Sequence, residues 1–338
     1  MVETMIRGMG KYLPETVYTS EEIEERAGFK RLGIKLGLVK MLTGCETRHY
    51  AAENEWCSDL AAKAGAAAIE DAGLTPADID AVIFGAITRD FAEPATVNRV
   101  VQLLGIPNCY AFDIFNACNA FIGGVDLADS LIKTGKAENV LVVCGEILSR
   151  WTKFDYTDKD ELLMRAPVAL SVGDGAGAFV ISKVNESDGD SRILATKFKT
   201  LPDLWEHGVI WGGGVIYPHA SDKLFVPGTV KALTDLHPEI AKTIVPEMLE
   251  RSGWTVDDID CFLPTQIANW VVKNARQILG AKEDQFYEVI KHTGNVGACN
   301  IPLTSCFAKE AGKIRKGSKI MMIGGAAGMS IGIINAIL

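Results

Sequence analysis

The chain has 338 residues, 48% hydrophobic and 23% charged, a composition typical of a globular protein large enough for two core-sized units. The formal net charge is -9 and no cluster of five or more Lys and Arg occurs, so we expect no nucleic-acid partner. Eight cysteines without a C-x-x-C pair favour free thiols, with no disulfide and no metal site. Residues 1–12 lack the apolar core of a signal peptide, which favours a cytoplasmic location.

Predicted helices and strands alternate along the first half of the chain. Residues 68–88 predict a helix, a glycine stop, a polar turn and a strand. A strand is predicted at 110–115, followed by a helix that Gly135 ends. Two further strands are predicted, at 140–145 and from Gly173 onward.

This pattern returns 180 residues later. The identical pairs are Glu70/Glu250, Gly73/Gly253, Thr75/Thr255, Asp78/Asp258, Ile79/Ile259 and Asp80/Asp260. VLVVCG (140–145) overlies IMMIGG (320–325), and Ala117-Cys118-Asn119 recurs as Ala298-Cys299-Asn300 at an offset of 181. We therefore predict an α/β fold of two similar βαβαββ halves, residues 1–185 and 186–338, with mainly parallel strands buried on both faces.

The last segment, 320–338, contains no charged residue and is long enough to span a membrane as a helix. Four glycines divide it, however, into two short apolar runs around a tight loop. We therefore predict two buried strands joined by a turn, and no membrane span.

Cys118 is predicted to lie where a strand ends and a helix begins. A helix N-terminus stabilises a thiolate through its partial positive charge and free N–H groups, and it can offer an N–H to an oxyanion. A buried packing role explains a single cysteine equally well. Position alone therefore leaves both interpretations open.

Four segments of the chain carry motifs of one enzyme family. FDIFNACNAFIGGVDLADSLIKTGKAENVLVVCGE closely resembles the active-site segment of the β-ketoacyl synthase III family, among the thiolase-like condensing enzymes. SVGDGAGAFVIS resembles its Gly-Asp-Gly-Ala-Gly-Ala strand, LPTQIANWVVKNARQILG its Pro-His-Gln-Ala-Asn helix and TGNVGACNIP its His-Gly-Asn-Thr-Ser segment. The resemblance spans most of the chain and is weakest over 14–42 and 183–230. It implies a thiolase-like fold with a layered αβαβα arrangement.

The resemblance implies that Cys118 takes an acyl group from a CoA or acyl-carrier-protein thioester. In the family that acyl group joins a carbanion, usually made by decarboxylating a malonyl thioester, while a His and an Asn hydrogen-bond to the thioester carbonyl. Asn295 matches the Asn, but Thr265 stands where the family has the His. A hydroxyl donates one hydrogen bond but is no base near neutral pH. His292 is a candidate replacement and His219 a weaker one.

The donor site is matched less well. Leu38 and Leu42 stand where the family has the Trp and Arg that hold the CoA adenine. The residues expected to contact the donor instead are Lys35, Lys40, Arg48, Arg150 and Arg165, although a surface lysine is solvated by default. Gly328, in the C-terminal glycine-rich turn, is expected to supply a second oxyanion N–H beside that of Cys118. Cys299 is expected to be structural.

We therefore expect an acyltransferase that forms acyl-Cys118 and makes a 3-oxoacyl product in fatty acid or polyketide synthesis, with no permanently bound cofactor. Two alternatives stay open. One is a non-decarboxylating member of the superfamily, such as an O- or N-acyltransferase or an enzyme akin to 3-hydroxy-3-methylglutaryl-CoA synthase. The other is a catalytically idle partner subunit. The resemblance also implies a homodimer paired through a sheet edge.

Overall fold

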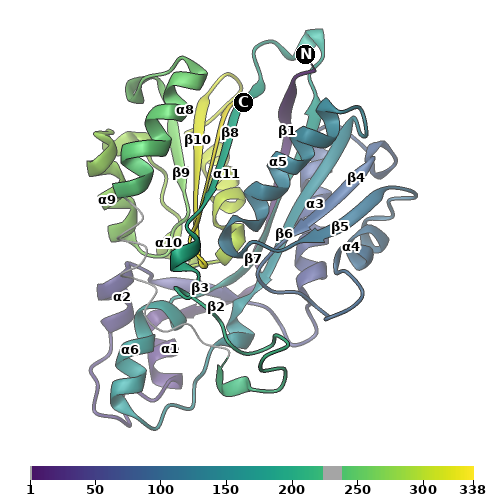
Figure 1. The fold of residues 1–338 in the computed structure, drawn as a ribbon. Coiled ribbons are helices and arrows are strands. Elements are labelled where there is room, and N and C mark those ends of the chain that lie inside the picture. Colours follow the sequence, from purple (N-terminus) through teal and green to yellow (C-terminus); the bar gives the residue numbers. More distant parts are fainter. Residues whose placement is uncertain (1, 224–237) are drawn as a thin grey trace.

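The computed structural model describes residues 2–223 and 238–338, which form two large β-sheets (Figure 1). The strand order is β1-β7-β6-β4-β5 in the first sheet and β8-β11-β10-β9 in the second, and a separate hairpin pairs β2 with β3. The strand bounds are β1 (Thr4–Tyr12), β2 (Thr16–Thr19), β3 (Thr47–Tyr50), β4 (Ala81–Gly85), β5 (Tyr110–Ile114), β6 (Asn139–Ile147), β7 (Asp174–Lys183), β8 (Arg192–Thr200), β9 (Cys261–Pro264), β10 (Lys319–Ala326) and β11 (Ser330–Ile337).

Helices form three layers around the two sheets (Figure 1). The outer layers are α3 (Cys57–Asp71) with α4 (Val97–Leu104) on the first sheet and α8 (Val245–Ser252) with α9 (Asn269–Leu279) on the second. Between the sheets lie α5 (Ala120–Lys133) and α11 (Asn300–Glu310). The smaller helices, near the β2–β3 hairpin, are α1 (Ser20–Arg26), α2 (Leu38–Thr43), α6 (Lys159–Ala169) and α10 (Ile290–Thr293). The predicted layered αβαβα arrangement is confirmed.

The prediction of mainly parallel strands is wrong. β4 pairs in parallel with β5 and β6, and β9 pairs in parallel with β10. The other pairs of the two sheets, β1–β7, β6–β7, β10–β11 and β8–β11, are antiparallel. The apolar runs that suggested parallel strands are instead explained by helices on both faces of each sheet, which bury antiparallel strands as well.

The sequence repeat is also a repeat of structure. The backbone N–H and the hydroxyl of Thr75 both donate to Asp78 Oδ2 at 2.7 Å, and Thr255 makes the same two bonds to Asp258 at 2.7 Å. Each bonded pair caps a short turn that leads into a buried strand, β4 in one half and β9 in the other. The proposed boundary between residues 185 and 186 falls between β7 and β8 and stays a prediction.

The uncharged segment 320–338 forms β10, a turn and β11, as predicted. The two strands pair along their whole length, and all their residues are buried except Lys319, Gly325 and Ile337 at their margins. Within residues 2–223 and 238–338, no helix has both the length and the apolar character needed to cross a membrane.

Burial on two sides fixes the position of α5. Phe121, Ile122, Val125 and Ala128 are fully buried, and the Phe121 ring packs edge-on against Phe179 of β7 with centroids 5.0 Å apart. Because α5 contacts strands of both sheets, its first turn lies at the seam between the two halves.

Candidate active site

Cys118 lies in a tight 3-10 turn, η2 (Ala117–Asn119), between β5 and the first residue of α5. Ala117 has a φ of 47°, a left-handed backbone conformation that costs free energy for a residue with a Cβ. Strain of this kind persists only where the surrounding packing holds it, and it is common beside reactive groups. The Cys118 side chain is half-buried at the start of α5.

Two backbone N–H groups approach the Cys118 sulfur, its own and that of Ala327. Ala327 belongs to the turn between β10 and β11, so the second N–H comes from the other half of the chain. Two converging N–H donors are what acyl transfer needs to stabilise an oxyanion. The expectation that Gly328 supplies this N–H is wrong, because the Gly328 N–H donates to the carbonyl oxygen of His207 at 2.9 Å.

The thiol of Cys118 is not acidified at rest. Burial, followed by the negative charge of Glu146, raises its pKa to about 12, and the two N–H groups lower it only in part. The prediction of a thiolate stabilised by the helix start is therefore wrong for the free protein. Fixed N–H groups of this kind can instead stabilise charge that develops during a reaction.

Asn295 presents one side of its amide to the site. Its Oδ1 accepts hydrogen bonds from the Gly297 N–H at 3.0 Å and from Asn300 Nδ2 at 2.9 Å. Its Nδ2 has no hydrogen-bond partner among residues 2–223 and 238–338, so it is free to donate to a substrate carbonyl. The turn η10 (Gly297–Cys299), which begins two residues later, packs against η2 and brings Asn295 to the Cys118 side of the seam.

Thr265 is held at the end of β10. Its backbone N–H donates to Ile323 O at 2.9 Å, and its Oγ1 accepts the Gly325 N–H at 3.3 Å, which leaves its hydroxyl hydrogen free to donate. Gly325 is two residues before Ala327, so the same strand end holds Thr265 and the second N–H of the sulfur site. An apolar cavity of about 560 Å³, including its opening to solvent, lies beside Thr265 between β10, α9 and Ile240.

Comparison with known proteins identifies the family. Models of 3-oxoacyl-[acyl-carrier-protein (ACP)] synthase III match residues 112–202 and, for the C-terminal part, 249–336. A β-ketoacyl-[acyl-carrier-protein] synthase III of Listeria welshimeri is 30% identical over 97% of this chain and 96% of its own length. One from Cereibacter sphaeroides is 32% identical over 95% of this chain and 94% of its own.

The chain belongs to the β-ketoacyl-[acyl-carrier-protein] synthase III family.

Solved structures agree. The synthase III of Aquifex aeolicus superposes with a TM-score of 0.85 at 28% identity, covering 99% of this chain and 100% of that one. OleA of Xanthomonas campestris with bound lauric acid and lauroyl-CoA gives 0.87 at 25% identity, covering 99% of both chains. The predicted family, the thiolase-like fold and the assignment as an acyltransferase are therefore confirmed.

Both candidate histidines of this synthase III relative are exposed, and a role for either beside Cys118 stays a prediction. His292 is exposed and faces the carboxylate of Glu46 at the surface, although it is three residues from Asn295 in the chain. His219 is also exposed. Cys299, by contrast, is fully buried with its sulfur 2.7 Å from that of Cys144, in agreement with the expected structural role.

The candidate donor residues lie in different settings. Lys35 is exposed, and Lys40 is exposed but pairs with Glu46 at 3.0 Å. Arg165 is largely buried in α6 and pairs with Glu161 at 3.4 Å. Arg48 is fully buried and donates to Ser20 Oγ and Leu170 O, so it is unable to reach a phosphate in solvent.

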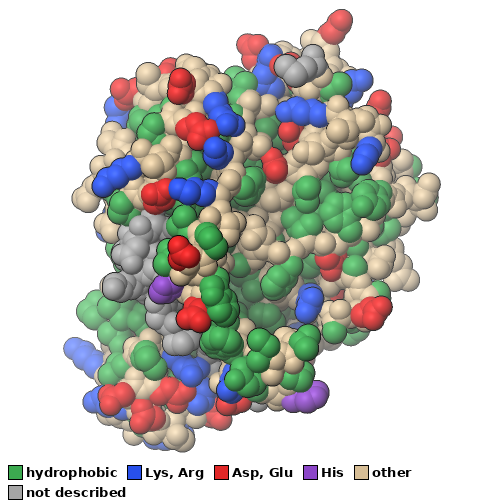
Figure 2. All heavy atoms as spheres, in the orientation of Figure 1, with side chains coloured by type: hydrophobic (Ala, Val, Ile, Leu, Met, Phe, Trp, Pro, Cys, Tyr) green, Lys and Arg blue, Asp and Glu red, His purple; other side chains and the backbone are tan. Residues whose placement is uncertain are grey.

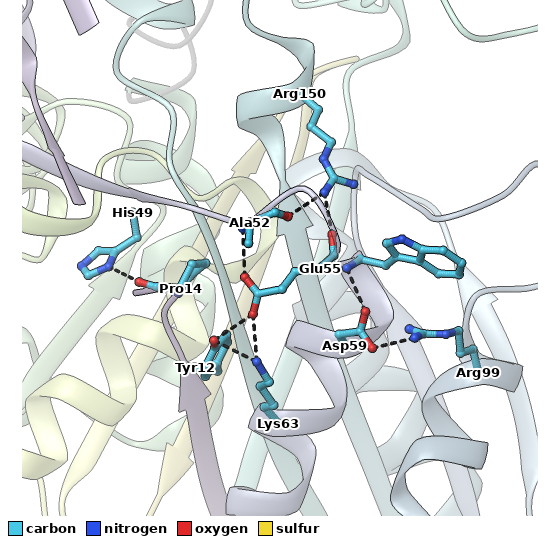
Figure 3. A network of polar contacts seen from close by, with 10 residues as sticks. Tyr12, Pro14, His49, Ala52, Glu55, Asp59, Lys63, Arg99 and Arg150 are labelled. Carbon is cyan, nitrogen blue, oxygen red and sulfur yellow. Dashed lines mark hydrogen bonds and ion pairs between the residues drawn. The ribbon is translucent and has the colours of Figure 1, made fainter. Parts of the chain in front are cut away.

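Arg150 holds a loop of the protein itself. Its Nη2 donates to the carbonyl oxygens of Ala52 and Glu55 at 3.0 and 2.6 Å (Figure 3). It also donates to the carbonyl oxygen of Glu53 at 3.0 Å. The Glu55 carboxylate below it is held by Tyr12 OH at 2.9 Å and Lys63 Nζ at 2.8 Å (Figure 3). This network gives Arg150 a structural function, and a donor role for it stays a prediction, as it does for Lys35, Lys40 and Arg165.

Glu146 is a site residue that the sequence analysis missed. It is fully buried at the end of β6, where its carboxylate accepts from the backbone N–H groups of Ile87, Thr88 and Ala298 and from the Thr88 hydroxyl. It thereby joins the end of β4 to η10. Burial raises its pKa to about 7, despite these hydrogen bonds. An acid at the end of the otherwise apolar run VLVVCGE was the available signal.

Glu146 should make stability depend on pH. Between its ordinary pKa of 4.5 and about 7 the folded protein keeps a proton on Glu146 that the unfolded chain loses. Its contribution to the free energy of unfolding is therefore complete below pH 4.5 and lost as pH rises through 7, with a slope of at most about 1.4 kcal/mol per pH unit. We expect Glu146→Gln to flatten this slope in urea unfolding at pH 5 to 8.

The exposed variant Glu21→Gln is the control and should keep the wild-type slope. Some slope will remain in Glu146→Gln, because burial also raises the pKa of Asp174 to about 6. A Glu146→Gln protein with the full wild-type slope would show that Glu146 keeps an ordinary pKa.

Proposed function

We propose that this synthase III relative transfers an acyl group from a CoA or carrier-protein thioester to Cys118 and then to the α-carbon of a second thioester, giving a 3-oxoacyl product. The observation that carries the proposal is the convergence of the Cys118 and Ala327 N–H groups on one half-buried sulfur. No comparison favours a non-decarboxylating enzyme or an idle subunit over it. The cytoplasmic location stays a prediction.

In the first half-reaction the Cys118 sulfur bonds to the thioester carbon and the donor thiolate leaves. Because the pKa of the Cys118 thiol is raised to about 12, its proton departs only as the bond forms, and the leaving thiolate receives it. The carbonyl oxygen becomes negative in this step and is stabilised by the two N–H groups. CoA or the carrier protein is released as the free thiol.

In the second half-reaction a malonyl thioester loses carbon dioxide and its α-carbon bonds to the acyl carbon on Cys118. The bond from that carbon to the Cys118 sulfur breaks, and the released thiolate takes a proton from solvent. The enolate oxygen that forms needs donors. Among the described residues, Asn295 Nδ2 and the Thr265 hydroxyl are each left free to donate such a hydrogen bond. The cavity beside Thr265 has walls of Ile240, Ile267, Val271 and Ile278, which suit an aliphatic rather than a charged group.

Acylation of Cys118 is the direct test. Wild-type protein is incubated with short, long, aromatic and dicarboxylic acyl-CoAs and weighed intact, with the bound lauroyl-CoA of OleA as a reason to include long chains. We expect at least one donor to add one acyl group, and none to modify Cys118→Ala. Cys109→Ala removes another half-buried thiol and should still be acylated. Wild type that stays unmodified with every donor rules out the acyl-enzyme.

Thr265 predicts slow decarboxylation. An oxyanion donor is worth about a hundredfold to a thousandfold in rate, and a hydroxyl replaces the family's His here. We expect Thr265→His, which has the neighbouring cavity for its ring, to raise carbon dioxide release from a malonyl thioester by about a hundredfold. Thr265→Val, which keeps the shape of Thr265 without its hydroxyl, should lower it. Equal rates in all three proteins would show that residue 265 does not contact the enolate.

We also propose a homodimer, paired through β5. This strand forms one edge of the first sheet, and Tyr110 and Phe115 at its ends are 62% and 69% exposed. Figure 2 shows hydrophobic side chains gathered over the position of β5. An apolar sheet edge is an aggregation hazard unless something covers it, and a second copy related by a two-fold axis covers both edges at once.

The dimer is tested by light scattering on a sizing column. Wild type should have twice the mass of the chain, whereas Tyr110→Asp/Phe115→Asp should be a monomer, because it places charges at an apolar interface. Val17→Asp changes an exposed apolar residue of β2 instead and should stay dimeric. Monomeric wild type at micromolar concentration would contradict the proposal.

A further inference from the structure

The repeated Ala-Cys-Asn triplet occupies equivalent corners in the two halves. The first triplet forms η2 before α5 and packs against β10 and β11, and the second lies at η10 and the start of α11, against β6 and β7. Each corner therefore lies on the sheet of the other half. The Asn of both triplets is buried, with 0% of Asn119 and 1% of Asn300 exposed. A buried amide on an inner helix requires an explanation, because it has to satisfy several hydrogen bonds away from water.

Asn119 ties the nucleophile turn to the oxyanion turn. Its Nδ2 donates to Ser330 O at 3.0 Å and to Ser330 Oγ at 2.9 Å. Ser330 is the first residue of β11, three residues after Ala327, and follows Met329, whose φ of 47° is strained like that of Ala117. Two hydrogen bonds thus connect the residue after Cys118 to the far side of the turn that supplies the second N–H.

The carbonyl oxygen of the Asn119 amide shows that burying this side chain costs free energy of folding. Its Oδ1 is buried and has no hydrogen-bond partner among the described residues. It lies directly against Gly324, where a Cβ would come within 2.0 Å of it. Gly324 is the repeat equivalent of Cys144, 180 residues earlier, so the first half has a side chain where the second half leaves room for the Asn119 amide. Because an unpaired buried oxygen destabilises the fold, apolar packing does not explain why residue 119 is an asparagine.

Asn300 performs the corresponding task for Asn295. Its Nδ2 donates to Asn295 Oδ1 at 2.9 Å and to Gly297 O at 3.0 Å, and its Oδ1 accepts from the Val296 N–H at 3.4 Å. With the Gly297 N–H it fixes the carbonyl side of the Asn295 amide. The Asn295 Nδ2 is consequently directed to the open side of the seam.

We propose that Asn119 and Asn300 are positioning residues for the two successive half-reactions. Asn119 sets the distance between the Cys118 and Ala327 N–H groups for acylation, and Asn300 orients the Asn295 amide for the acceptor thioester. The inference rests on the proposed function. It gives the two copies of one triplet different and separable roles.

The two half-reactions are measured separately. Single-turnover acylation of Cys118 is followed by intact mass, and transfer from the preformed acyl-enzyme is followed by release of product from a malonyl thioester. Small misplacements of reacting groups cost on the order of a hundredfold in rate. We expect Asn119→Ala to slow acylation at least tenfold at saturating donor, with an unchanged half-saturating donor concentration. We expect Asn300→Ala to acylate within about twofold of wild type and to slow transfer at least tenfold.

Milder variants and a control guard against simple unfolding. Ser330→Ala removes one acceptor of Asn119, and Asn300→Ser keeps a short donor; each should show a smaller effect on the same half-reaction as its Ala counterpart. Cys299→Ala perturbs the second corner without touching either amide and should leave both rates unchanged. Melting temperatures are compared for all variants.

The outcomes separate the two proposals. If wild type accepts no acyl group, the proposed function fails and the inference falls with it. If wild type is acylated but the Asn119 and Ser330 variants acylate at the wild-type rate, the inference alone is overturned. It is also overturned if the Asn119 and Asn300 variants slow both half-reactions equally in proportion to their loss of stability, since that is the behaviour of purely structural residues.

Discussion

The active-site geometry depends on one contact between backbones, the packing of η2 from the first half against the β10–β11 turn of the second. This contact brings the Ala327 N–H to the Cys118 sulfur, which neither half provides alone. The position of η2 is fixed by α5, which follows it directly in the chain. Helix α5 packs against both sheets through fully buried side chains such as Phe121 and Val125. Close-packed interiors deform little, so the core fixes where η2 and the β10–β11 turn meet, and the proposed role of the Asn119 hydrogen bonds to Ser330 is to set the separation of the two donors within that frame.

Burial has opposite effects on Cys118 at rest and during reaction. It removes water from the sulfur, which raises the thiol pKa and makes the resting nucleophile weak. The same low-polarity surroundings strengthen the interaction of fixed N–H groups with an oxyanion. Under the proposed function, the two N–H groups therefore stabilise the charge of the tetrahedral intermediate, which makes a protonated resting thiol compatible with acyl transfer. The pKa of the Glu146 carboxyl group is itself raised, so this group carries less negative charge near neutral pH. It therefore opposes the development of negative charge beside the sulfur less than an ordinary carboxylate would.

The sequence predicted features that depend on local pattern. The duplication, the two C-terminal strands and the helix starting after Cys118 are all encoded in short-range periodicity and turn residues. Strand direction was predicted wrongly because an apolar run reports burial on both faces, not the direction of the neighbouring strand. The family motifs located Asn295 and Thr265, whereas the exposure of His292 depends on packing around α10 that no motif encodes.

The oxyanion donor was misplaced by one residue for a related reason. Which N–H of a glycine-rich turn points at the sulfur depends on backbone angles, here a φ of 71° at Gly328 and 47° at Met329, and on the His207 carbonyl that captures the Gly328 N–H. His207 lies in a segment that the repeat does not cover. The donor-binding residues stay predictions for a similar reason, because the sequence does not tell whether the partner of a lysine or arginine is a ligand or, as for Arg150, also carbonyl groups of the protein itself.

The two Ala-Cys-Asn triplets have the same residues, so any difference in the properties of their cysteines comes from the side chains and backbone that pack against each triplet. Cys118 and Cys299 each precede a buried helix, and both have Ala before them and Asn after them. The Cys299 sulfur contacts the sulfur of Cys144 and the carbonyl oxygen of Gly175, and Cys299 is fully buried. In the first triplet the equivalent glycine, Gly324, lies against the Asn119 amide, and the Ala327 N–H approaches the Cys118 sulfur. The side chain of Cys144 and the glycine at 324 thus give the two triplets different surroundings, which is consistent with the proposed reactive role of Cys118 and the buried position of Cys299.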